Sequence, residues 1–270
     1  AKIWFSSQNT KRNVLSYNGS LYYNPSSESV RNLIIKGVEE IVQNYDVDGI
    51  HMDDYFYPAF TEKNVGTAFD APEYEQQIKS DMSSTDSQSF SSNKSSNEIS
   101  LADWRRNNVN RLVSGIYKAI KENNPQVTFG ISPAGNLDNL RNDLEYYVDI
   151  DTWVSQNGYV DYLMPQIYYG FYNEVKPFVS VLEEWEQLST KVSLMPVLAF
   201  YKVGAIDKFA KEGMNEWIEN SDIIMREVLL SRNLAQYQGF SLFRYDYLFN
   251  TDLQTNTTMA EVKNMKKVIK

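Results

Sequence analysis

The sequence contains no cysteine and only one histidine, and both shortages limit its chemistry. Without cysteine, thiol catalysis, disulfide bonds and thiolate metal sites are excluded. Because His51 is the only imidazole, a zinc site with several histidines is impossible, and a Ser-His-Asp triad would depend on that single residue. We therefore expect no metal and no organic cofactor, and an esterase or deacetylase reaction is disfavoured.

Several other features are missing. No apolar run is long enough to cross a bilayer, and no secretory leader begins at Ala1, so we expect any export signal to lie outside these residues. The phosphate-binding patterns G-x-G-x-x-G and G-x-x-x-x-G-K-[ST] do not occur, which disfavours a dinucleotide or P-loop site. A net charge of -9 argues against nucleic acid or an anionic membrane as a partner.

The composition is that of a globular protein with many aromatic residues. The 270 residues are 42% hydrophobic and 23% charged, enough for one large domain with a substantial core. Aromatic side chains make up 14% of the chain, including 19 Tyr and 5 Trp. Most of these rings are expected to fill the core. A surface rich in Tyr and Trp also suits sugars, whose C–H faces stack on aromatic planes.

Apolar strand segments alternate with helical segments along the chain, at intervals of about 30–40 residues. Strands are predicted at 47–53, 126–132, 160–168, 192–200 and 239–245. Helices with apolar positions at the 3.6-residue period are predicted at 26–44, from 101 onwards, after 169, at 213–232 and at 258–269. Ser26 or Ser27 is the expected N-cap of the first helix, and Ser100 with Asp103 resembles a capping box. The alternation predicts an α/β fold with a parallel sheet covered by helices.

The region 59–100 interrupts this alternation. Between residues 80 and 100 about half of the positions are Ser, and large apolar residues are almost absent. Such a segment cannot bury a core, so a mobile loop is predicted over 80–100. It follows the carboxyl end of a predicted strand, which would place it over the catalytic face of a barrel.

Residues 47–58 (VDGIHMDDYFYP) are typical of a buried strand that ends in two aspartates. Because side chains alternate along a strand, the apolar residues share one side while His51 and Asp53 share the other. A carboxylate at the end of a strand, within alternating strands and helices, is what a barrel enzyme offers at its catalytic rim. The alternative is that Asp53 and Asp54 simply cap the following turn.

Four segments resemble, in the same order, the motifs of one bacterial family: residues 47–58, 104–110 (WRRNNVN), 129–133 (FGISP) and 161–168 (DYLMPQIY). They are similar to the glycosyl-hydrolase-like family ten, cell-envelope glycosidases built on a TIM barrel, and the resemblance covers nearly the whole chain. The cysteine-free, Ser/Asn-rich character is most similar to the lytic transglycosylases of clostridial cell walls. The resemblance implies a secreted protein of the cell wall or cell surface that acts on peptidoglycan glycan strands.

Members of this family carry further strands ahead of the region that residues 21–25 resemble. The five strands predicted here would then be the fourth to the eighth of the barrel. A barrel cannot close on these strands alone without exposing two edges. We therefore expect residues 1–270 to be the C-terminal part of one TIM-barrel domain, completed by an N-terminal fragment of the same barrel.

Glycoside cleavage requires a proton donor at the leaving oxygen and stabilisation of an oxocarbenium-like centre. Asp53 is the first choice for the acid, because it shares a strand face with His51, and Asp54 is the second. Neighbouring carboxylates raise each other's proton affinity, which suits a general acid. We expect His51 to be a hydrogen-bonding neighbour of Asp53 rather than a base.

The sequence leaves several mechanisms open. In a lytic transglycosylase the sugar's own 6-hydroxyl attacks and gives an anhydro product. In an arrangement similar to that of N-acetylhexosaminidases the 2-acetamido group attacks, with one aspartate orienting it and the other acting as acid. An ordinary pair of carboxyl groups, about 5–5.5 Å apart in a retaining enzyme or about 6.5–9.5 Å apart in an inverting one, would use Asp246 as the partner.

Supporting roles are predicted for polar and aromatic residues at the strand ends. Gln166 and Tyr168 are expected to bind sugar hydroxyls, with packing as the alternative. Tyr55 and Tyr57 are expected either to stack on sugars or to hold the loop that follows them.

Charged side chains complete the candidate site. Arg105 or Arg106, near the start of a helix, is expected to reach the catalytic face, with a solvated arginine as the alternative. Arg244 and Asp246 are expected to contact substrate or, alternatively, to pair with each other. The rival function is a non-catalytic glycan-binding barrel, which would keep the aromatic residues and tolerate the loss of either aspartate.

Overall fold

The structure, a computed structural model, divides into two compact units that are described separately below. It describes residues 6, 11–60, 69–84, 99–142, 146–188 and 191–269. Unit 1 consists of Ala1–Val47, Tyr55–Val127 and Leu140–Asp149. Unit 2 consists of Asp48–Asp54, Thr128–Asn139 and Ile150–Lys270.

Unit 1 begins with an antiparallel hairpin of two short strands, β1 (Val14–Tyr17) and β2 (Ser20–Tyr23). The turn between them is Asn18-Gly19, and both residues have positive φ, 47° and 77°. Two such residues in a two-residue loop match the right-handed twist of the flanking strands. A 3-10 helix, η1 (Lys11–Asn13), precedes the hairpin.

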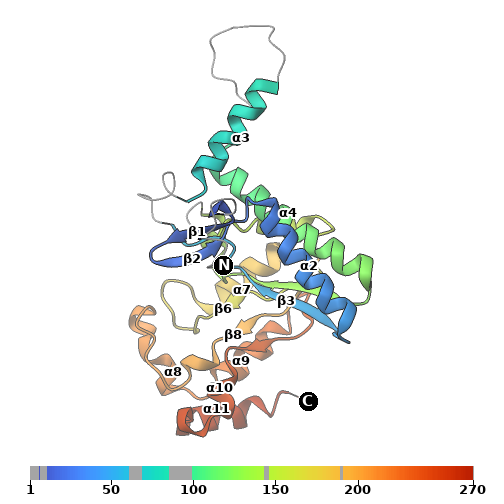
Figure 1. The fold of residues 1–270 in the computed structure, drawn as a ribbon. Helices are drawn as coiled ribbons and strands as arrows, with labels where there is room; N and C mark the ends of the chain where they lie inside the picture. Colours follow the sequence, from blue (N-terminus) through green and yellow to red (C-terminus); the bar gives the residue numbers. More distant parts are fainter. Residues whose placement is uncertain are drawn as a thin grey trace. The chain divides into compact units, whose positions relative to one another are not determined.

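Two long helices dominate unit 1, α2 (Glu28–Asn44) and α4 (Leu101–Asn123), and they lie side by side (Figure 1). Ser27 caps α2 by accepting a hydrogen bond from Val30 N, and Ser100 caps α4 by accepting one from Asp103 N, as the sequence predicts. The apolar face of α4 is buried over Val109, Leu112, Val113, Ile116 and Ile120.

A third helix, α3 (Ala71–Ser84), lies within the stretch expected to be a long excursion. The expected loop at 80–100 is therefore wrong for residues 80–84, which are helical; residues 85–98 lie outside the described residues. Pro72 suits the first turn of a helix, and the residues after it, EYEQQIK, are mostly strong helix formers. Their propensity outweighs the Ser content on which the prediction rested.

Unit 2 is built on a parallel sheet, as predicted. Its strands are β3 (Gly49–Asp53), β4 (Thr128–Ser132), β5 (Tyr162–Leu163), β6 (Gln166–Ile167), β7 (Ser193–Leu194), β8 (Val197–Leu198) and β9 (Ser241–Leu242). They form two ladders, β3-β4-β5-β7 and β6-β8-β9, with every pair parallel. Because β5 and β6 belong to one extended segment, and β7 and β8 to another, the ladders follow the order of the five predicted strands. The α/β fold class is confirmed.

The two faces of this sheet differ sharply. Met52 lies opposite Ile131, which lies opposite Leu163 and then Leu194, and the last three are buried. On the other face His51, Gly130, Tyr162 and Ser193 are aligned in the same way, and His51 is exposed. The alternation expected for the first strand is therefore present, with one apolar face and one polar face.

Helices follow the strands in unit 2. They are α5 (Leu137–Arg141), whose last residues belong to unit 1, α6 (Ile150–Ser155), α7 (Phe178–Leu188), α8 (Glu216–Glu219), α9 (Ile223–Ser231), α10 (Tyr245–Phe249) and α11 (Asn256–Met265). Three 3-10 helices accompany them: η2 (Phe200–Lys202), η3 (Lys211–Asn215) and η4 (Thr251–Leu253). Among the described residues, no helix is both long and apolar enough to cross a membrane.

The single helix predicted at 213–232 is wrong, because the chain breaks between α8 and α9 at residues 220–222. The break has a tertiary cause. Glu261 of α11 accepts a hydrogen bond from Met225 N at 3.0 Å, so a carboxylate from a distant helix caps the start of α9. A helix that ran unbroken through 220–222 would have used its own carbonyl oxygen for that N–H group.

Candidate active site

The two aspartates at the carboxyl end of β3 have different surroundings. Asp53 lies opposite Ser132 in the register and is exposed on the polar face, on the same side as His51. Asp54 is only 1% exposed, and its Oδ2 accepts a hydrogen bond from Ala134 N at 2.7 Å. One carboxylate is therefore open to a ligand, and its neighbour is fixed by the backbone beyond β4.

His51 lies flat against Tyr162 on this polar face. The ring centroids are 5.9 Å apart with an interplanar angle of 7°, and the Tyr162 hydroxyl is 3.3 Å from His51 Nδ1. The strand between them allows this contact, because a Cβ at Gly130 would meet the Tyr162 ring at 2.0 Å. Partial burial of the ring lowers the pKa of His51 from its usual 6.5, against the opposing effect of Asp53, and this favours a neutral imidazole.

Gln166 holds the ends of β4 and β6 together. Its Nε2 donates to Ser132 O at 3.0 Å, and its backbone bridges Ala134, the residue whose N–H binds Asp54. The structure thus brings Gln166 into the frame that fixes Asp54. The side-chain contact described for Gln166 is with the backbone. This contact corresponds to a packing role, which the sequence left open as the alternative to sugar binding.

An aromatic cluster marks the carboxyl ends of β6, β8 and β9. Tyr168 follows β6, Tyr201 lies in η2 just after β8, and Phe243 follows β9. Tyr168 and Phe243 stack at 5.6 Å, while Tyr201 stands edge-on to both, at 5.7 Å and 5.8 Å. Lys202 Nζ donates to Tyr168 O at 2.8 Å and pairs with Asp207.

Arg244 and Asp246 form an ion pair with 2.8 Å between Nη2 and Oδ2. This is the alternative that the sequence left open, and both side chains remain partly exposed. Arg244 also lies over the Tyr247 ring, 5.7 Å from its centroid. β3 begins the first ladder and β9 ends the second, so Asp246 follows the last strand in the order and Asp53 ends the first.

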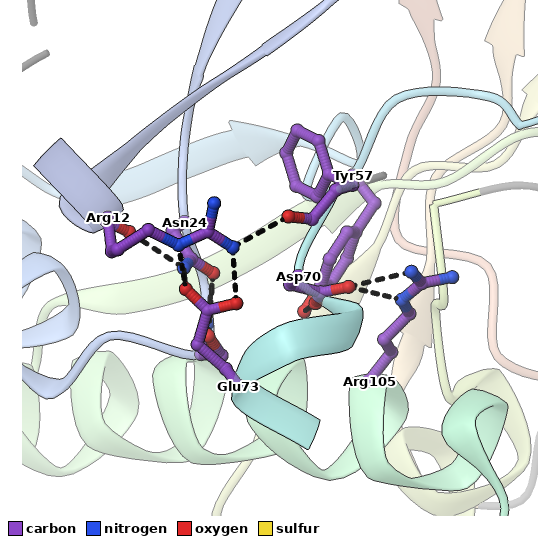
Figure 2. A network of polar contacts seen from close by, with 8 residues as sticks. Arg12, Asn24, Tyr57, Asp70, Glu73 and Arg105 are labelled. Atoms are coloured by element: carbon purple, nitrogen blue, oxygen red, sulfur yellow. Dashed lines mark hydrogen bonds and ion pairs between the residues drawn. The ribbon is translucent and has the colours of Figure 1, made fainter. Parts of the chain in front are cut away.

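Tyr57 and Arg105 are buried in unit 1, where the structure corrects their expected contact with sugar. Arg105 pairs with Asp70 at 2.6 Å, and both side chains are 0% exposed. Tyr57 donates its hydroxyl hydrogen to Asp70 Oδ2 at 2.8 Å. Figure 2 shows Tyr57 and Arg105 converging on this carboxylate, with Arg12 and Glu73 as a separate pair nearby. Sequence reasoning missed Asp70, because an isolated aspartate between Phe69 and Ala71 gives no local signal.

Aromatic rings enclose the Arg105 guanidinium. Its Cζ lies 4.7 Å from the Phe60 centroid and 5.0 Å from that of Tyr147, whose hydroxyl accepts a hydrogen bond from Arg105 Nη1 at 2.7 Å. A cation enclosed in this way is held in place and cannot reach a ligand. Tyr55 differs: it is 63% exposed and contacts Tyr146 edge-on at 5.1 Å, which leaves much of its ring accessible.

Residues 3–215 match the family described as glycosyl hydrolase-like 10. The chain belongs to this family. It is 35% identical to the glycosyl hydrolase YngK of Bacillus subtilis over 84% of its own length, and 32% identical to the glycosyl hydrolase DigH of Escherichia coli O6:H1 over 83%. It covers 42% and 49% of those proteins, so it spans about half the length of the curated relatives it matches.

The fold resembles that of the PgaB (BpsB) glycoside hydrolase domain from Bordetella bronchiseptica, with a TM-score of 0.53 and 9% identity. The match covers 90% of this chain and 64% of that one, and it supports a TIM-barrel-type fold. Which barrel strands β3 to β9 represent stays a prediction.

Within this glycosyl hydrolase-like fold, sequence reasoning also missed Tyr162, Tyr201 and Phe243. Parity along the predicted strand at 160–168 would have placed Tyr162 on one face, but its contact with His51 depends on register across Gly130. The positions of Tyr201 and Phe243 follow from strand order. No group of three or more His, Asp or Glu side chains is arranged to hold a metal ion in the part of the chain that the structure describes.

Proposed function

We propose that this protein cleaves glycosidic bonds in the glycan strands of bacterial peptidoglycan, as a lytic transglycosylase or a hydrolase. Membership of the glycosyl hydrolase-like family supports glycan cleavage in general. The choice of peptidoglycan rests on the resemblance of the sequence to cell-wall enzymes, as does a location outside the cell, at the wall or surface.

The observation that carries the proposal is the unequal pair of aspartates at the end of β3. Glycosidases divide acid and stabilising roles between carboxyl groups whose environments differ. In this proposal exposed Asp53 donates a proton to the leaving oxygen. Buried Asp54, which accepts a hydrogen bond from Ala134 N, fixes the backbone geometry beside it.

The chemistry then depends on the attacking group. The proton leaves Asp53 for the glycosidic oxygen as the bond to the anomeric carbon breaks. The sugar's 6-hydroxyl, its acetamido oxygen or water supplies the electron pair to that carbon, and the proton of an attacking hydroxyl or water returns to the Asp53 carboxylate. Asp246 follows β9 and pairs with Arg244, and the proposed proton transfer from Asp53 does not require it.

We also propose that an N-terminal fragment of the same barrel completes the sheet. Within the described strands, β3 pairs with β4 alone and β9 with β8 alone, which leaves one unpaired edge at each end of the strand order. Barrels abolish such edges by closure. The greater length of the relatives supports the same proposal.

Single replacements test the catalytic assignment. Asp53→Asn and Asp54→Asn are compared with the parent for release of fragments from purified peptidoglycan. Asp252→Asn, on the exposed surface of η4, is the matched control. We expect Asp53→Asn to lose at least about 100-fold in rate, the usual contribution of a general acid. If both variants release fragments at the parent rate, the acid assignment fails.

The products separate the mechanisms. Mass spectrometry of fragments with anhydro ends indicates a transglycosylase, whereas reducing ends indicate a hydrolase. If the protein with its N-terminal strands present binds glycan but releases nothing, the non-catalytic glycan-binding function replaces the proposal.

A further inference from the structure

The aromatic cluster at the carboxyl ends of β6, β8 and β9 is held rigidly. Phe243 N donates to Leu198 O at 2.9 Å, and Phe243 O accepts from Tyr201 N at 3.0 Å. Lys202 is anchored to buried Asp207 and binds the carbonyl oxygen of Tyr168. The three rings of Tyr168, Tyr201 and Phe243 therefore have fixed relative positions, and a ligand would not have to order them on binding.

These rings are not core filler. In unit 1 the cluster of Tyr57, Phe60, Phe69 and Tyr147 uses similar edge-to-face contacts, and each ring is at most 4% exposed. Phe243 is 43% exposed, although a phenyl ring has no hydrogen-bonding group for water to contact. A rigid aromatic group at the carboxyl ends of parallel strands, with one ring left open, has the form of a binding surface.

We propose that Tyr168, Tyr201 and Phe243 form a stacking platform for one pyranose ring of the glycan, with Phe243 as the contact plane. The C–H face of a sugar lies against an aromatic plane, which accounts for an exposed apolar ring. The Arg244–Asp246 pair beside the platform supplies a donor and acceptors for ring hydroxyls. The inference rests on the proposed function for the identity of the sugar, an N-acetylhexosamine.

The platform contacts the C–H face of a sugar and not the glycosidic oxygen that receives the proton. Phe243 follows β9 and Asp53 ends β3, the last and the first strands in the described strand order. Replacing the platform should therefore weaken binding of oligomeric glycan and raise KM, while kcat at saturation changes little. A residue that acted on the reacting bond would instead lower kcat.

Binding is measured by calorimetry with the β1,4-linked tetramer of N-acetylglucosamine, in the Asp53→Asn background so that no cleavage occurs. Phe243→Ala removes the ring, and Phe243→Leu keeps the apolar packing but removes the flat face. We expect both to weaken binding about five- to tenfold, the equivalent of one aromatic stacking contact. Phe243→Tyr should stay within about twofold of the parent. Phe209→Ala, at an 85% exposed ring that is not one of the three platform rings, is the matched control and should not change binding.

Three results overturn the platform. They are parent-like binding by Phe243→Leu, a loss by Phe243→Tyr equal to that of Phe243→Ala, and no binding of the tetramer by the Asp53→Asn background. The proposed function fails independently, if the parent releases no fragments while the platform variants still differ in affinity. If the parent cleaves glycan and Phe243→Leu has the same KM as the parent, the proposed function holds and the platform proposal is wrong.

Discussion

The structure pairs Arg105 and Arg244 each with an aspartate in opposite surroundings, although the sequence predicts that both arginines contact substrate. Arg105 and Asp70 meet at 2.6 Å with both side chains 0% exposed. Arg244 and Asp246 meet at 2.8 Å with side chains 53% and 39% exposed. The contact distances are almost equal, so the difference lies in what surrounds each pair. Burial marks the first as part of the scaffold and leaves the second available to a ligand.

The residues around the buried pair explain why the ion pair is stable in the interior. Removing two charges from water is costly unless the remaining hydrogen-bonding capacity is also satisfied. Here Tyr57 donates to Asp70, and Tyr147 accepts from Arg105. The exposed pair keeps its water, so exchange of one partner for a ligand hydroxyl costs little. An arginine near a catalytic face is therefore informative only when its burial is known.

The largest loss of stability is expected when the buried pair is broken. Asp70→Asn leaves the Arg105 charge uncompensated in an apolar setting, and we expect a loss of about 3–5 kcal/mol in the free energy of unfolding. Urea denaturation measures it. Asp246→Asn, which removes the same carboxylate from the exposed pair, is the matched control and should cost less than about 1 kcal/mol. Equal losses in the two variants would contradict the comparison.

A buried carboxyl group that forms no ion pair among the described residues extends the same comparison. Glu261 accepts the Met225 N–H, and burial raises its pKa from 4.5 to about 7, against the opposing effect of such backbone donors. Neighbouring Glu227 is fully buried, and neither of its carboxyl oxygens has a hydrogen-bond partner among the described residues. Burial, reinforced by Glu261, raises the pKa of Glu227 well above its usual value.

The raised pKa of Glu261 predicts that the protein becomes less stable as the pH rises. The folded state of Glu261 holds a proton that the unfolded state has released, so its contribution is complete below pH 4.5 and is lost as the pH rises to about 7. We expect stability to fall by about 3 kcal/mol across that window from this group. Glu261→Gln should flatten this part of the profile, measured by urea denaturation at each pH. Glu219→Gln, on the exposed side of α8, is the control. An unchanged slope in Glu261→Gln would contradict the assignment.

Local features of the fold were predictable because neighbouring residues determine them. Ser27 and Ser100 cap helices through bonds to N–H groups three residues away, and side-chain alternation places His51 and Asp53 on one face. The break before α9 was not predictable. Glu261, which caps that helix, lies 36 residues beyond Met225 along the chain.

In the candidate site, too, features set by neighbouring residues were predictable and features set by distant residues were not. Tyr168 was predicted as a candidate site residue because it ends a strand. The ion pair between Arg244 and Asp246 was predicted as one of two alternatives, because the two residues are close in sequence. Arg105 was assigned to the site because its helix begins near the expected face. Its partner Asp70 lies 35 residues earlier, so only the tertiary structure shows that the guanidinium is enclosed. The platform ring Phe243 depends on strand order, which the sequence does not specify residue by residue.

A smaller effect tests the hydrogen bonds around the buried pair. Tyr57→Phe removes the hydroxyl that donates to Asp70 but keeps the ring and its packing. We expect a loss of about 1 kcal/mol in the free energy of unfolding, the usual contribution of one such bond. Tyr45→Phe, at a 65% exposed side chain just after α2, makes the same chemical change and should leave stability unaltered. A larger loss in Tyr45→Phe than in Tyr57→Phe would contradict the structural contrast between the two tyrosines.

The smallest effect on stability is expected from the exposed pair, and it is the most specific test of the comparison. Arg244→Gln removes the charge and part of the donor fork, and the free energy of unfolding should change by less than about 0.5 kcal/mol, because solvent screens this pair. Cleavage of oligomeric glycan should nevertheless show a KM raised about three- to tenfold, since hydrogen bonds from a charged donor to sugar hydroxyls are lost. Arg105→Gln should give the opposite result, with a large loss of stability and an unchanged KM in the fraction that stays folded. A stability loss in Arg244→Gln as large as that in Arg105→Gln, or a parent-like KM, would mean that exposure does not distinguish the roles of the two pairs.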